Sequence, residues 1–510
     1  MPDRYQQAAQ VASARSVRFT LPDSWNADLP PRTYQIKGAA WLLLANRGLL
    51  ADQVGLGKSI VTLLLICMLK QLKQPYRTLI ITTKGTQRQW IREANRFTNL
   101  PVVAARGQKT HRVMAYTSKR WDICVTTWPL ILRDYSYLKQ INPDVIVMDE
   151  VAAIRTPGAK TSQLTKLLTR GIPRIVELNA TPTETSLIDV FSQIEALHMG
   201  VFGDLSNFEQ RYIRRDAVKV KRGSMTYVQH VIVGYKNVDE FKARIRPFVL
   251  RRRASDPEVA AELPEVTSEV VWLELPPAQR RRYEEARRGV IRVYQGGGRG
   301  LPLRSHFHHV QQACDTTSVF GDDPAVSVKL DWLLSALNGD LAGEKVVVFS
   351  QYKATLRDLS ARLEAAGIGY RLYTGDESED VRDAACQAFW NDPDVLVLAG
   401  TSALERGLNL QNSAFLININ MSWNPQREVQ RAGRLRRIGS PHARVVVITL
   451  MTTDTLEGRL YERVSERAAV ASFVQDDGDD TMFDVIRDDQ LMALLGIDER
   501  DSLNSDSKDL

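Results

Sequence analysis

Short apolar runs that end in polar turns recur along the chain, and helical spacing follows most of them. Five runs fall in the first half, within residues 48–53, 77–83, 122–127, 144–150 and 175–181. Five more fall in the second half, within residues 345–351, 369–375, 394–400, 415–420 and 445–450. Continuous Val, Ile and Leu strands that alternate with helices are typical of parallel sheets covered on both faces. The pattern therefore predicts an α/β protein with two lobes.

The stretch from about residue 202 to residue 331 differs in composition from these two halves, because it is rich in arginine. Its segment "PAQRRRYEEARRGVIRVY" predicts one long basic helix over residues 277–294, and the glycines of 296–300 predict a mobile loop. We read this stretch as a largely helical basic bridge between the lobes. The predicted domains are an N-terminal extension (1–28), a first lobe (29–201), the bridge (202–330), a second lobe (331–474) and an acidic tail (475–510).

Composition excludes some classes of protein. The chain has 510 residues, 44% of them apolar, which is enough for roughly three domains with ample cores. The apolar stretch 60–69 is too short to span a bilayer, and the first residues lack a signal-peptide pattern. The four cysteines are scattered without any Cys-x-x-Cys pair, which argues against a zinc site and a disulfide framework. We expect a cytosolic protein with reduced cysteines and no membrane association.

The formal net charge of +7 conceals an asymmetry along the chain. Residues 476–510 contain twelve acidic and three basic residues, a net charge of −9, so the preceding 475 residues carry +16. A basic body suits a polyanionic partner, because lysine and arginine release counterions from a phosphate backbone. An ordinary solvated surface explains the same charge equally well. The tail also contains an amphipathic segment, residues 485–497, that could dock against the body or against a protein partner.

Candidate chemistry begins at "LLADQVGLGKSI", residues 49–60. A glycine turn before a helix points several backbone N–H groups at a bound phosphate, and the helix N-terminus favours the negative charge. Gly55 and Gly57 supply the turn. In the P-loop pattern Lys58 would reach the β- and γ-phosphates of ATP, and Ser59 would hold Mg²⁺. Asp52 replaces the first glycine of that pattern, so a tight turn between a buried strand and a helix stays open as a less favoured alternative, and the context along the chain must decide.

A second candidate lies where the strand within residues 144–150 ends. Asp149 and Glu150 follow the apolar run directly. Nucleotide-binding sheets place carboxylates at such a strand end, one for magnesium and one to orient the attacking water. We assign Asp149 to the metal and Glu150 to the water. An acidic pair after a strand is usually a solvated loop, so this assignment depends on the P-loop upstream and on the segments downstream.

The order of segments resembles the seven-motif pattern of helicase superfamily two, and specifically its Swi/Snf-related ATPases. "LPPRTYQIKGAAWLL" resembles the segment whose Gln reads the adenine, which is Gln35 here. "LLADQVGLGKS" resembles that family's P-loop, including the Asp at position 52, so Leu56 joins the candidate nucleotide-binding residues. "TLIITTKGTQRQWIREANRF" resembles the next motif, with Lys84 as a coupling or DNA-contact candidate and Trp90 as a recurrent aromatic residue.

Two further motifs of the first lobe resemble the family with departures. "VMDEVAAIRTPGAKTSQ" keeps both carboxylates but has Ala152 where the family has His, which puts coupling rather than hydrolysis in doubt. "LNATPTET" resembles the coupling motif and makes Thr181 a candidate. "FGDLSNFEQRYI" and "IRPFVLRRRASDPEVAAELPE" resemble stretches of the Swi/Snf branch that simple RNA helicases lack.

The second lobe carries the remaining motifs. "LAGTSALERGLNLQNSAFLININMSWNP" resembles motif five, with Thr401 as a candidate and with Arg406 where relatives have small or acidic residues. "QREVQRAGRLRRIG" resembles motif six and gives Gln430, Arg434 and Arg437. Arginines from one lobe can neutralise charge on a γ-phosphate bound by the other lobe only when the lobes close. We therefore expect Arg434 and Arg437 to complete the catalytic site.

This resemblance implies two RecA-like lobes that hydrolyse ATP with Mg²⁺ and move on duplex DNA, which they hold mostly through phosphates. It also implies a monomer, and the lack of added targeting modules suits a small bacterial or viral genome, so we expect a bacterial or virus-infected host cytoplasm rather than a nucleus. A strand-separating or annealing helicase is one alternative. A nucleic-acid-binding ATP switch with little turnover is another, suggested by Ala152 and Arg406.

Overall fold

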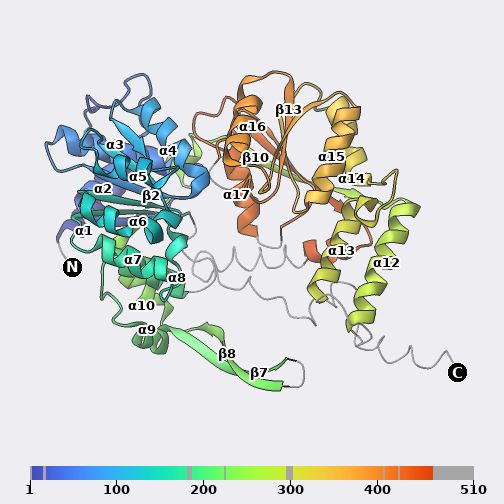
Figure 1. The fold of residues 1–510 in the computed structure, drawn as a ribbon, viewed down its shortest axis with the longest axis horizontal. Coiled ribbons are helices and arrows are strands. Elements are labelled where there is room, and N and C mark those ends of the chain that lie inside the picture. The colour runs from blue at the N-terminus through green and yellow to red at the C-terminus, as the bar shows by residue number, and fades with distance from the viewer. Residues whose placement is uncertain are drawn as a thin grey trace. The chain divides into compact units, whose positions relative to one another are not determined.

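The chain folds into two compact units that divide between Glu262 and Leu263. The computed structural model describes residues 3–14, 19–180, 187–222, 225–294, 303–405, 408–422 and 425–462 (Figure 1). Thr181, Arg406, the predicted loop 296–300 and the acidic tail lie outside these described residues. Within them, no helix is long and apolar enough to cross a membrane.

The first unit is built on a seven-stranded sheet in the order β3-β4-β2-β5-β6-β1-β9, and every neighbouring pair is parallel. The strands are β1 (Arg47–Leu50), β2 (Thr78–Thr82), β3 (Val102–Ala104), β4 (Ile123–Thr127), β5 (Val145–Asp149), β6 (Arg174–Leu178) and β9 (Val249–Leu250). Successive residues of β2 enter two different apolar clusters, Leu79 and Ile81 one of them and Ile80 the other. Both faces of this sheet are therefore buried, as continuous apolar strands predict.

Helices cover the two faces of this sheet, and the first unit also contains a separate two-stranded ribbon. The longer helices are α1 (Asp3–Ser13), α2 (Thr33–Ala45), α3 (Lys58–Gln71), α4 (Lys84–Phe97), α5 (Lys109–Thr117), α6 (Trp128–Ile141), α7 (Lys160–Thr169), α8 (Leu187–Leu197), α9 (Leu205–Tyr212) and α10 (Val238–Ile245). The short ones are η1 (Val151–Ile154), η2 (Arg246–Phe248) and α11 (Pro257–Ala260). A separate antiparallel ribbon consists of β7 (Ile213–Arg222) and β8 (Met225–Tyr235).

The second unit is built on a six-stranded parallel sheet in the order β10-β15-β14-β11-β13-β12. Its strands are β10 (Glu265–Leu273), β11 (Val346–Phe349), β12 (Gly369–Tyr373), β13 (Val395–Gly400), β14 (Phe415–Asn418) and β15 (Arg444–Thr452). Its helices are α12 (Pro277–Tyr294), α13 (Leu303–Asp315), η3 (Thr317–Phe320), α14 (Val328–Asn338), α15 (Lys353–Ala365), α16 (Glu379–Asn391) and α17 (Pro425–Leu435).

The sequence pattern anticipated most of this architecture. All ten apolar runs overlap a strand, both large sheets are parallel, and the long basic helix is α12. The segment predicted as a bridge is divided between the units, since α9, the ribbon and β9 belong to the first and β10, α12 and α13 to the second. The predicted α/β class with two lobes is therefore confirmed.

One core residue of the first unit has a buried carboxyl group that its surroundings do not compensate with hydrogen bonds. Glu177 lies in β6 between Leu49 of β1 and Met148 of β5 and is fully buried. No group among the described residues forms a hydrogen bond with either of its carboxylate oxygens. Burial raises the pKa of Glu177 well above its usual value. A raised pKa means that the folded state is favoured while Glu177 is protonated and loses stability as the pH rises through that pKa.

Replacing Glu177 with leucine is expected to stabilise the first unit by about 1–3 kcal/mol at neutral pH, the cost of burying a polar group without a partner. The gain should be smaller at pH 5 than at pH 8, because the carboxyl ionises more readily in the unfolded chain than in the folded one, and the wild type loses stability as the pH rises. Hydrogen exchange of the amides in β5, β6 and β1 at both pH values measures the change. Glu177→Gln is the matched control, since it removes the titration but keeps a polar group. A leucine variant with faster exchange than the wild type would contradict the prediction.

Candidate nucleotide site and coupling elements

The turn between β1 and α3 has the geometry of a phosphate cradle. Gly55 has φ 91° and Gly57 has φ 72°, backbone angles that glycine adopts readily and other residues rarely do. Gly57 caps the 14-residue helix α3, whose first residue is Lys58. A Cβ atom at position 57 would lie 2.7 Å from the Nε2 atom of Gln35, so a larger residue there would displace the end of that side chain. The predicted turn is thus present at the N-terminus of a helix.

Lys58 and Gln35 both contact this turn. The Lys58 Nζ atom donates to the main-chain oxygens of Asp52, at 2.7 Å, and Gln53, at 3.4 Å. Gln35 is buried, accepts a hydrogen bond from the main-chain N–H of Arg32 at 2.9 Å, and approaches the carbonyl oxygen of buried Leu56 at 3.5 Å. Ser59 is half-buried in the first turn of α3. The structure therefore brings the sequence-predicted residues 35, 52 and 55–59 together.

The aspartate that replaces the first P-loop glycine forms a buried ion pair. Asp52 is fully buried, and its Oδ1 atom accepts hydrogen bonds from the main-chain N–H of Arg252 at 3.1 Å and from its Nε atom at 3.0 Å. The Arg252 Nη2 atom contacts Asp52 Oδ2, and the guanidinium lies 4.9 Å from the centre of the Tyr34 ring. Because charged hydrogen bonds of this fork geometry are strong and directional, the pair fixes the rim of the turn. The sequence did not reveal Arg252.

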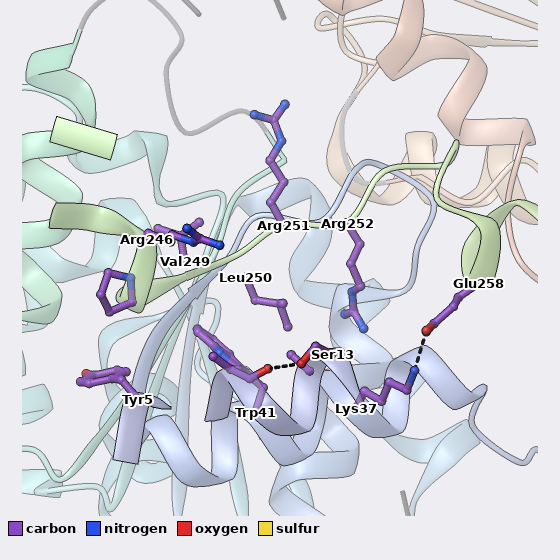
Figure 2. A pocket seen from close by; sticks show the side chains of 13 residues that line it. Tyr5, Ser13, Lys37, Trp41, Arg246, Val249, Leu250, Arg251, Arg252 and Glu258 are labelled. Atoms are coloured by element: carbon purple, nitrogen blue, oxygen red, sulfur yellow. Dashed lines mark hydrogen bonds and ion pairs between the residues drawn. The ribbon is translucent and has the colours of Figure 1, made fainter. Parts of the chain in front are cut away.

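Backbone hydrogen bonds also connect the P-loop turn to the segment around β9. The main-chain N–H of Ala51 donates to Leu250 O at 2.7 Å, and that of Gln53 donates to Arg252 O at 3.0 Å. These bonds continue the β1–β9 ladder into the turn. Figure 2 shows Arg252 on the segment that follows β9, beside a pocket that α1 and α2 also line, with Lys37 paired to Glu258 at 2.6 Å. The P-loop is therefore held from the side by a segment about 200 residues further along the chain.

Removing the Asp52 charge should destabilise the first unit, because the Arg252 side chain is only 13% exposed and would be left without its carboxylate partner. We expect Asp52→Asn to lower the free energy of unfolding by ~3 kcal/mol, the lower end of the range for breaking a buried pair. Denaturant titration measures this change. The control is Arg251→Ala, which removes an exposed arginine next to Arg252 and should change stability by less than about 0.5 kcal/mol. Equal effects of the two substitutions would contradict the importance of the pair.

The predicted acidic pair lies at the end of β5. Asp149 Oδ2 accepts hydrogen bonds from the Thr82 hydroxyl and from Trp90 Nε1, both at 2.8 Å. Burial and the neighbouring Glu150 carboxylate raise the pKa of Asp149 to about 6. Glu150 has φ 53° and ψ 54°, in the left-handed region that non-glycine residues seldom adopt and that occurs often at functional sites. Trp90, which the sequence marked only as a recurrent aromatic residue, thus positions the carboxylate of Asp149.

The P-loop and the acidic pair share one edge of the sheet. In the order β5-β6-β1, the turn follows the carboxyl end of β1 and Asp149 ends β5. Ligands of open parallel sheets bind at the carboxyl ends of the strands. Lys84, the first residue of α4, is exposed. Among the described residues, no group of three or more His, Cys, Asp or Glu side chains could hold a metal ion.

The predicted residues of the second unit lie around α17. Thr401 follows β13 and is buried, and Gln430 lies on α17. Arg434 is buried; its Nε atom donates to Glu405 O at 2.7 Å, and its main-chain oxygen accepts from Leu410 at 3.0 Å. Arg437 follows the end of α17 and is half-buried. The structure therefore joins the segments predicted as motifs five and six.

Arg431 also joins these two segments, and the sequence did not single it out. It is buried, and its guanidinium contacts the Glu405 carboxylate at 2.8 Å and Asn418 Oδ1 at 2.9 Å. Because Arg431 and Arg434 both bond to Glu405, α17 is held against the segment that follows β13. This fixes the helix on which Arg434 and Gln430 lie.

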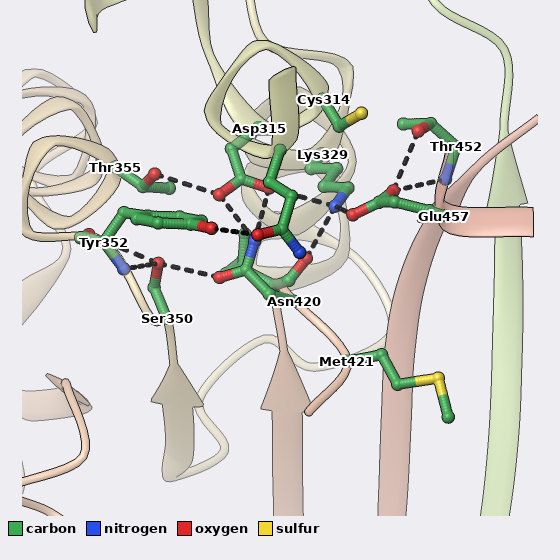
Figure 3. Close-up of polar contacts among 12 residues, drawn as sticks. Cys314, Asp315, Lys329, Ser350, Tyr352, Thr355, Asn420, Met421, Thr452 and Glu457 are labelled. Atoms are coloured by element: carbon green, nitrogen blue, oxygen red, sulfur yellow. Dashed lines mark hydrogen bonds and ion pairs between the residues drawn. The ribbon is translucent and has the colours of Figure 1, made fainter. Parts of the chain in front are cut away.

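The second unit also contains a buried polar cluster (Figure 3). The Lys329 Nζ atom contacts Asp315 Oδ1 at 3.0 Å, Glu457 Oε1 at 2.6 Å and Ile419 O at 2.7 Å. Asn420 donates to both Asp315 carboxylate oxygens at 2.6 Å. Burial and the nearby Glu457 raise the pKa of Asp315 to about 6, although Lys329 opposes the shift. The cluster connects α13 and α14 to the segment after β14.

Together, a lysine at the start of a helix, a glycine turn and paired carboxylates two strands away are the features of a P-loop nucleotide hydrolase. The profile of the SNF2-related domain matches residues 34–315, and that of the helicase conserved C-terminal domain matches residues 328–439. The chain belongs to the SNF2-related family.

Individual relatives agree with this family. The chain is 26% identical over 491 residues to the SWI/SNF-related matrix-associated actin-dependent regulator of chromatin subfamily A member 1 of Homo sapiens, covering 91% of this chain and 45% of that protein. It is 28% identical over 474 residues to a probable ATP-dependent DNA helicase of Arabidopsis thaliana, covering 86% and 41%. The chain thus spans less than half the length of these curated relatives.

A solved structure supports the fold. The Hef helicase domain of Pyrococcus furiosus has a TM-score of 0.51 and 16% identity, covering 85% of this chain and 98% of that chain. This likeness concerns the fold alone. It agrees with two RecA-like lobes, the architecture that the two parallel sheets indicate.

Proposed function

We propose that the chain is a DNA translocase that hydrolyses ATP in order to move along duplex DNA. The observation that supports this most directly is that the P-loop turn, Lys58 and the Asp149–Glu150 pair share the carboxyl edge of one sheet, in a chain of the SNF2-related family. The name of the Arabidopsis relative points to DNA as the nucleic acid.

In this proposal the first unit binds the nucleotide. Gln35 reads the adenine, the backbone N–H groups of 55–59 and the Lys58 ammonium bind the phosphates, and Glu150 orients the attacking water. Ser59 and Asp149 offer hydroxyl and carboxylate oxygens, which are the ligands that Mg²⁺ prefers, so these two would hold it. When bound, the metal ion neutralises charge on the phosphates.

In this proposal the second unit supplies positive charge to the transferring phosphoryl group. Arg434 and Arg437 stabilise the transferring phosphoryl group when the units close on ATP. Lys84, Thr401 and Gln430 are proposed to contact DNA or to couple hydrolysis to movement, as is Thr181. Duplex DNA would be held mainly through its phosphates, with little sequence preference, because phosphate contacts carry no sequence information directly. Closure and reopening of the two units would then shift the DNA contacts of one unit relative to those of the other.

The decisive experiment is steady-state ATP hydrolysis by the purified chain without nucleic acid and with single-stranded DNA, duplex DNA or RNA. We expect strong stimulation by duplex DNA alone, and no turnover from Glu150→Gln, which keeps the shape of the side chain but removes its charge. Stimulation by single strands or RNA instead would overturn the choice of duplex DNA. A lack of stimulation by every nucleic acid would favour an ATP switch with little turnover.

Strand separation is the second candidate, because the Arabidopsis relative is named a DNA helicase. The two activities differ in what they displace. A translocase on duplex DNA removes a triplex-forming strand but leaves a forked duplex paired, whereas a helicase opens the fork. Measuring both with the same protein and the same ATP concentration distinguishes the two candidates.

A further inference from the structure

The ribbon of β7 and β8 forms a two-stranded sheet of its own. Within the part of the chain that the structure describes, the two strands pair only with each other, with Ile213 opposite Tyr235 at the root and Arg222 opposite Met225 near the tip. Figure 1 shows the ribbon extending away from α9 and α10. A two-stranded ribbon without a third strand or a covering helix is marginally stable in water. Its length therefore calls for a function outside the core of the first unit.

The root of the ribbon is firmly anchored. Tyr212 and Ile213, where α9 passes into β7, are buried. The Tyr212 ring lies 5.7 Å from that of Phe202, 5.1 Å from that of Phe208 and 5.6 Å from that of Phe241. The Tyr212 hydroxyl also donates to Glu240 at 2.9 Å. Such an aromatic cluster holds the direction of the ribbon relative to the sheet of the first unit.

The ribbon is strongly basic in sequence. Residues 213–235 contain a single acidic residue, Asp216, and five cationic ones: Arg214, Arg215, Lys219, Lys221 and Arg222. At the root, Arg214 and Asp216 are exposed, and Arg215 pairs with Glu209 at 2.9 Å. Charge therefore concentrates on β7, far from the nucleotide-binding turn in sequence.

Size and charge agree with one partner. Ten residues of strand extend for about 33 Å, close to one helical turn of DNA at roughly 34 Å. The major groove accepts a two-stranded ribbon, and lysine and arginine bind its flanking phosphates. We propose that the β7–β8 ribbon is a contact surface for the phosphate backbone of duplex DNA. The proposal rests on the proposed function, and it adds a DNA-binding surface that lies outside the helicase motifs.

A different explanation for the same charges is protection of exposed strand edges. Lysines on an edge strand discourage pairing with other chains. In that case the cations would affect aggregation and leave DNA affinity unchanged. The two explanations therefore predict different results when the charges are removed.

The test removes three charges near the tip by Lys219→Thr, Lys221→Thr and Arg222→Thr, since threonine favours strands. Retention of labelled duplex DNA on filters is measured over a range of salt concentrations. We expect affinity to fall about tenfold or more at roughly 0.1 M salt, and the slope of log affinity against log salt to become shallower by up to ~2.7, about 0.9 for each contact. The reverse change, Asp216→Lys, should strengthen binding and steepen the slope.

The control removes three exposed cations elsewhere in the first unit by Lys119→Thr, Arg120→Thr and Lys139→Thr. It should bind DNA like the wild type. Wild-type affinity and slope in the ribbon variant, or an equal loss in the control, would overturn the proposal. If the ribbon variant does not fold, wild-type affinity in Asp216→Lys overturns it. Wild-type protein that binds duplex DNA through the ribbon but shows no DNA-stimulated hydrolysis would instead refute the proposed function.

Discussion

Replacing Lys58 with alanine is expected to abolish ATP hydrolysis. Its ammonium lies at the first residue of α3, against the carbonyl oxygens of the turn that would cradle the phosphates. Loss of one preorganised charge at a reacting group typically costs 100- to 1000-fold in rate, so we expect a decrease of at least about that size. Retention of DNA should remain largely intact, because we propose that the phosphates of DNA are bound outside this turn. Phosphate release and filter binding measure the two properties in one preparation.

Lys70→Ala is the matched control for this substitution. Lys70 lies near the other end of α3, pairs with Asp122 at 3.1 Å and is partly exposed. Its loss should leave hydrolysis near the wild-type rate. If Lys58→Ala lost DNA retention and hydrolysis to the same extent, the role assigned to Lys58 would be wrong.

The second large effect concerns stability of the second unit. Lys329→Met should lower its free energy of unfolding by about 3–5 kcal/mol, since Asp315 and Glu457 would remain buried without their cation. Both the Lys329 and the Asp315 side chains are fully buried, so water cannot compensate. Burial by itself would lower the pKa of Lys329, but the carboxylates of Glu457 and Asp315 raise it above its usual value. Denaturant titration followed by circular dichroism measures the loss.

Lys353→Met provides a control within the same unit. Lys353 also pairs with an aspartate, Asp376 at 2.5 Å, but the two side chains are 50% and 68% exposed. An exposed pair contributes about 0–1 kcal/mol, so this variant should remain close to the wild type. Similar decreases in the free energy of unfolding of the two variants would show that the buried cluster contributes no more to stability than an exposed ion pair.

Local patterns in the sequence predicted the strands and most of the nucleotide site. The strand runs are continuous and apolar, and Lys58, Asp149 and Glu150 directly follow such runs or their turns. Each of these features lies within about a dozen residues, so the local sequence is enough to recognise the feature. The alternation in "AVKVKR" and "YVQHVIV" indicates strands too, but the density of arginine around it favoured a helical bridge.

Contacts between distant segments could not be predicted in this way. Arg252 is one of three successive arginines, and no local pattern shows that this one turns towards Asp52. The same is true of Lys329 and Glu457, which are 128 residues apart. Trp90 could be recognised as a recurrent residue, but its hydrogen bond to Asp149 depends on the packing of α4 beside the sheet.

The strand β9 has a consequence for the synthesis of the protein. Asp52 and Arg252 are 200 residues apart, and a ribosome adds roughly 5–20 residues per second, so Arg252 is made about 10–40 s after Asp52. During that time the growing chain has its glycine turn and Lys58 but not the ion pair that fixes the turn. We therefore expect a nascent chain to acquire its affinity for nucleotide late, when two residues of β9 join the edge of an otherwise complete sheet.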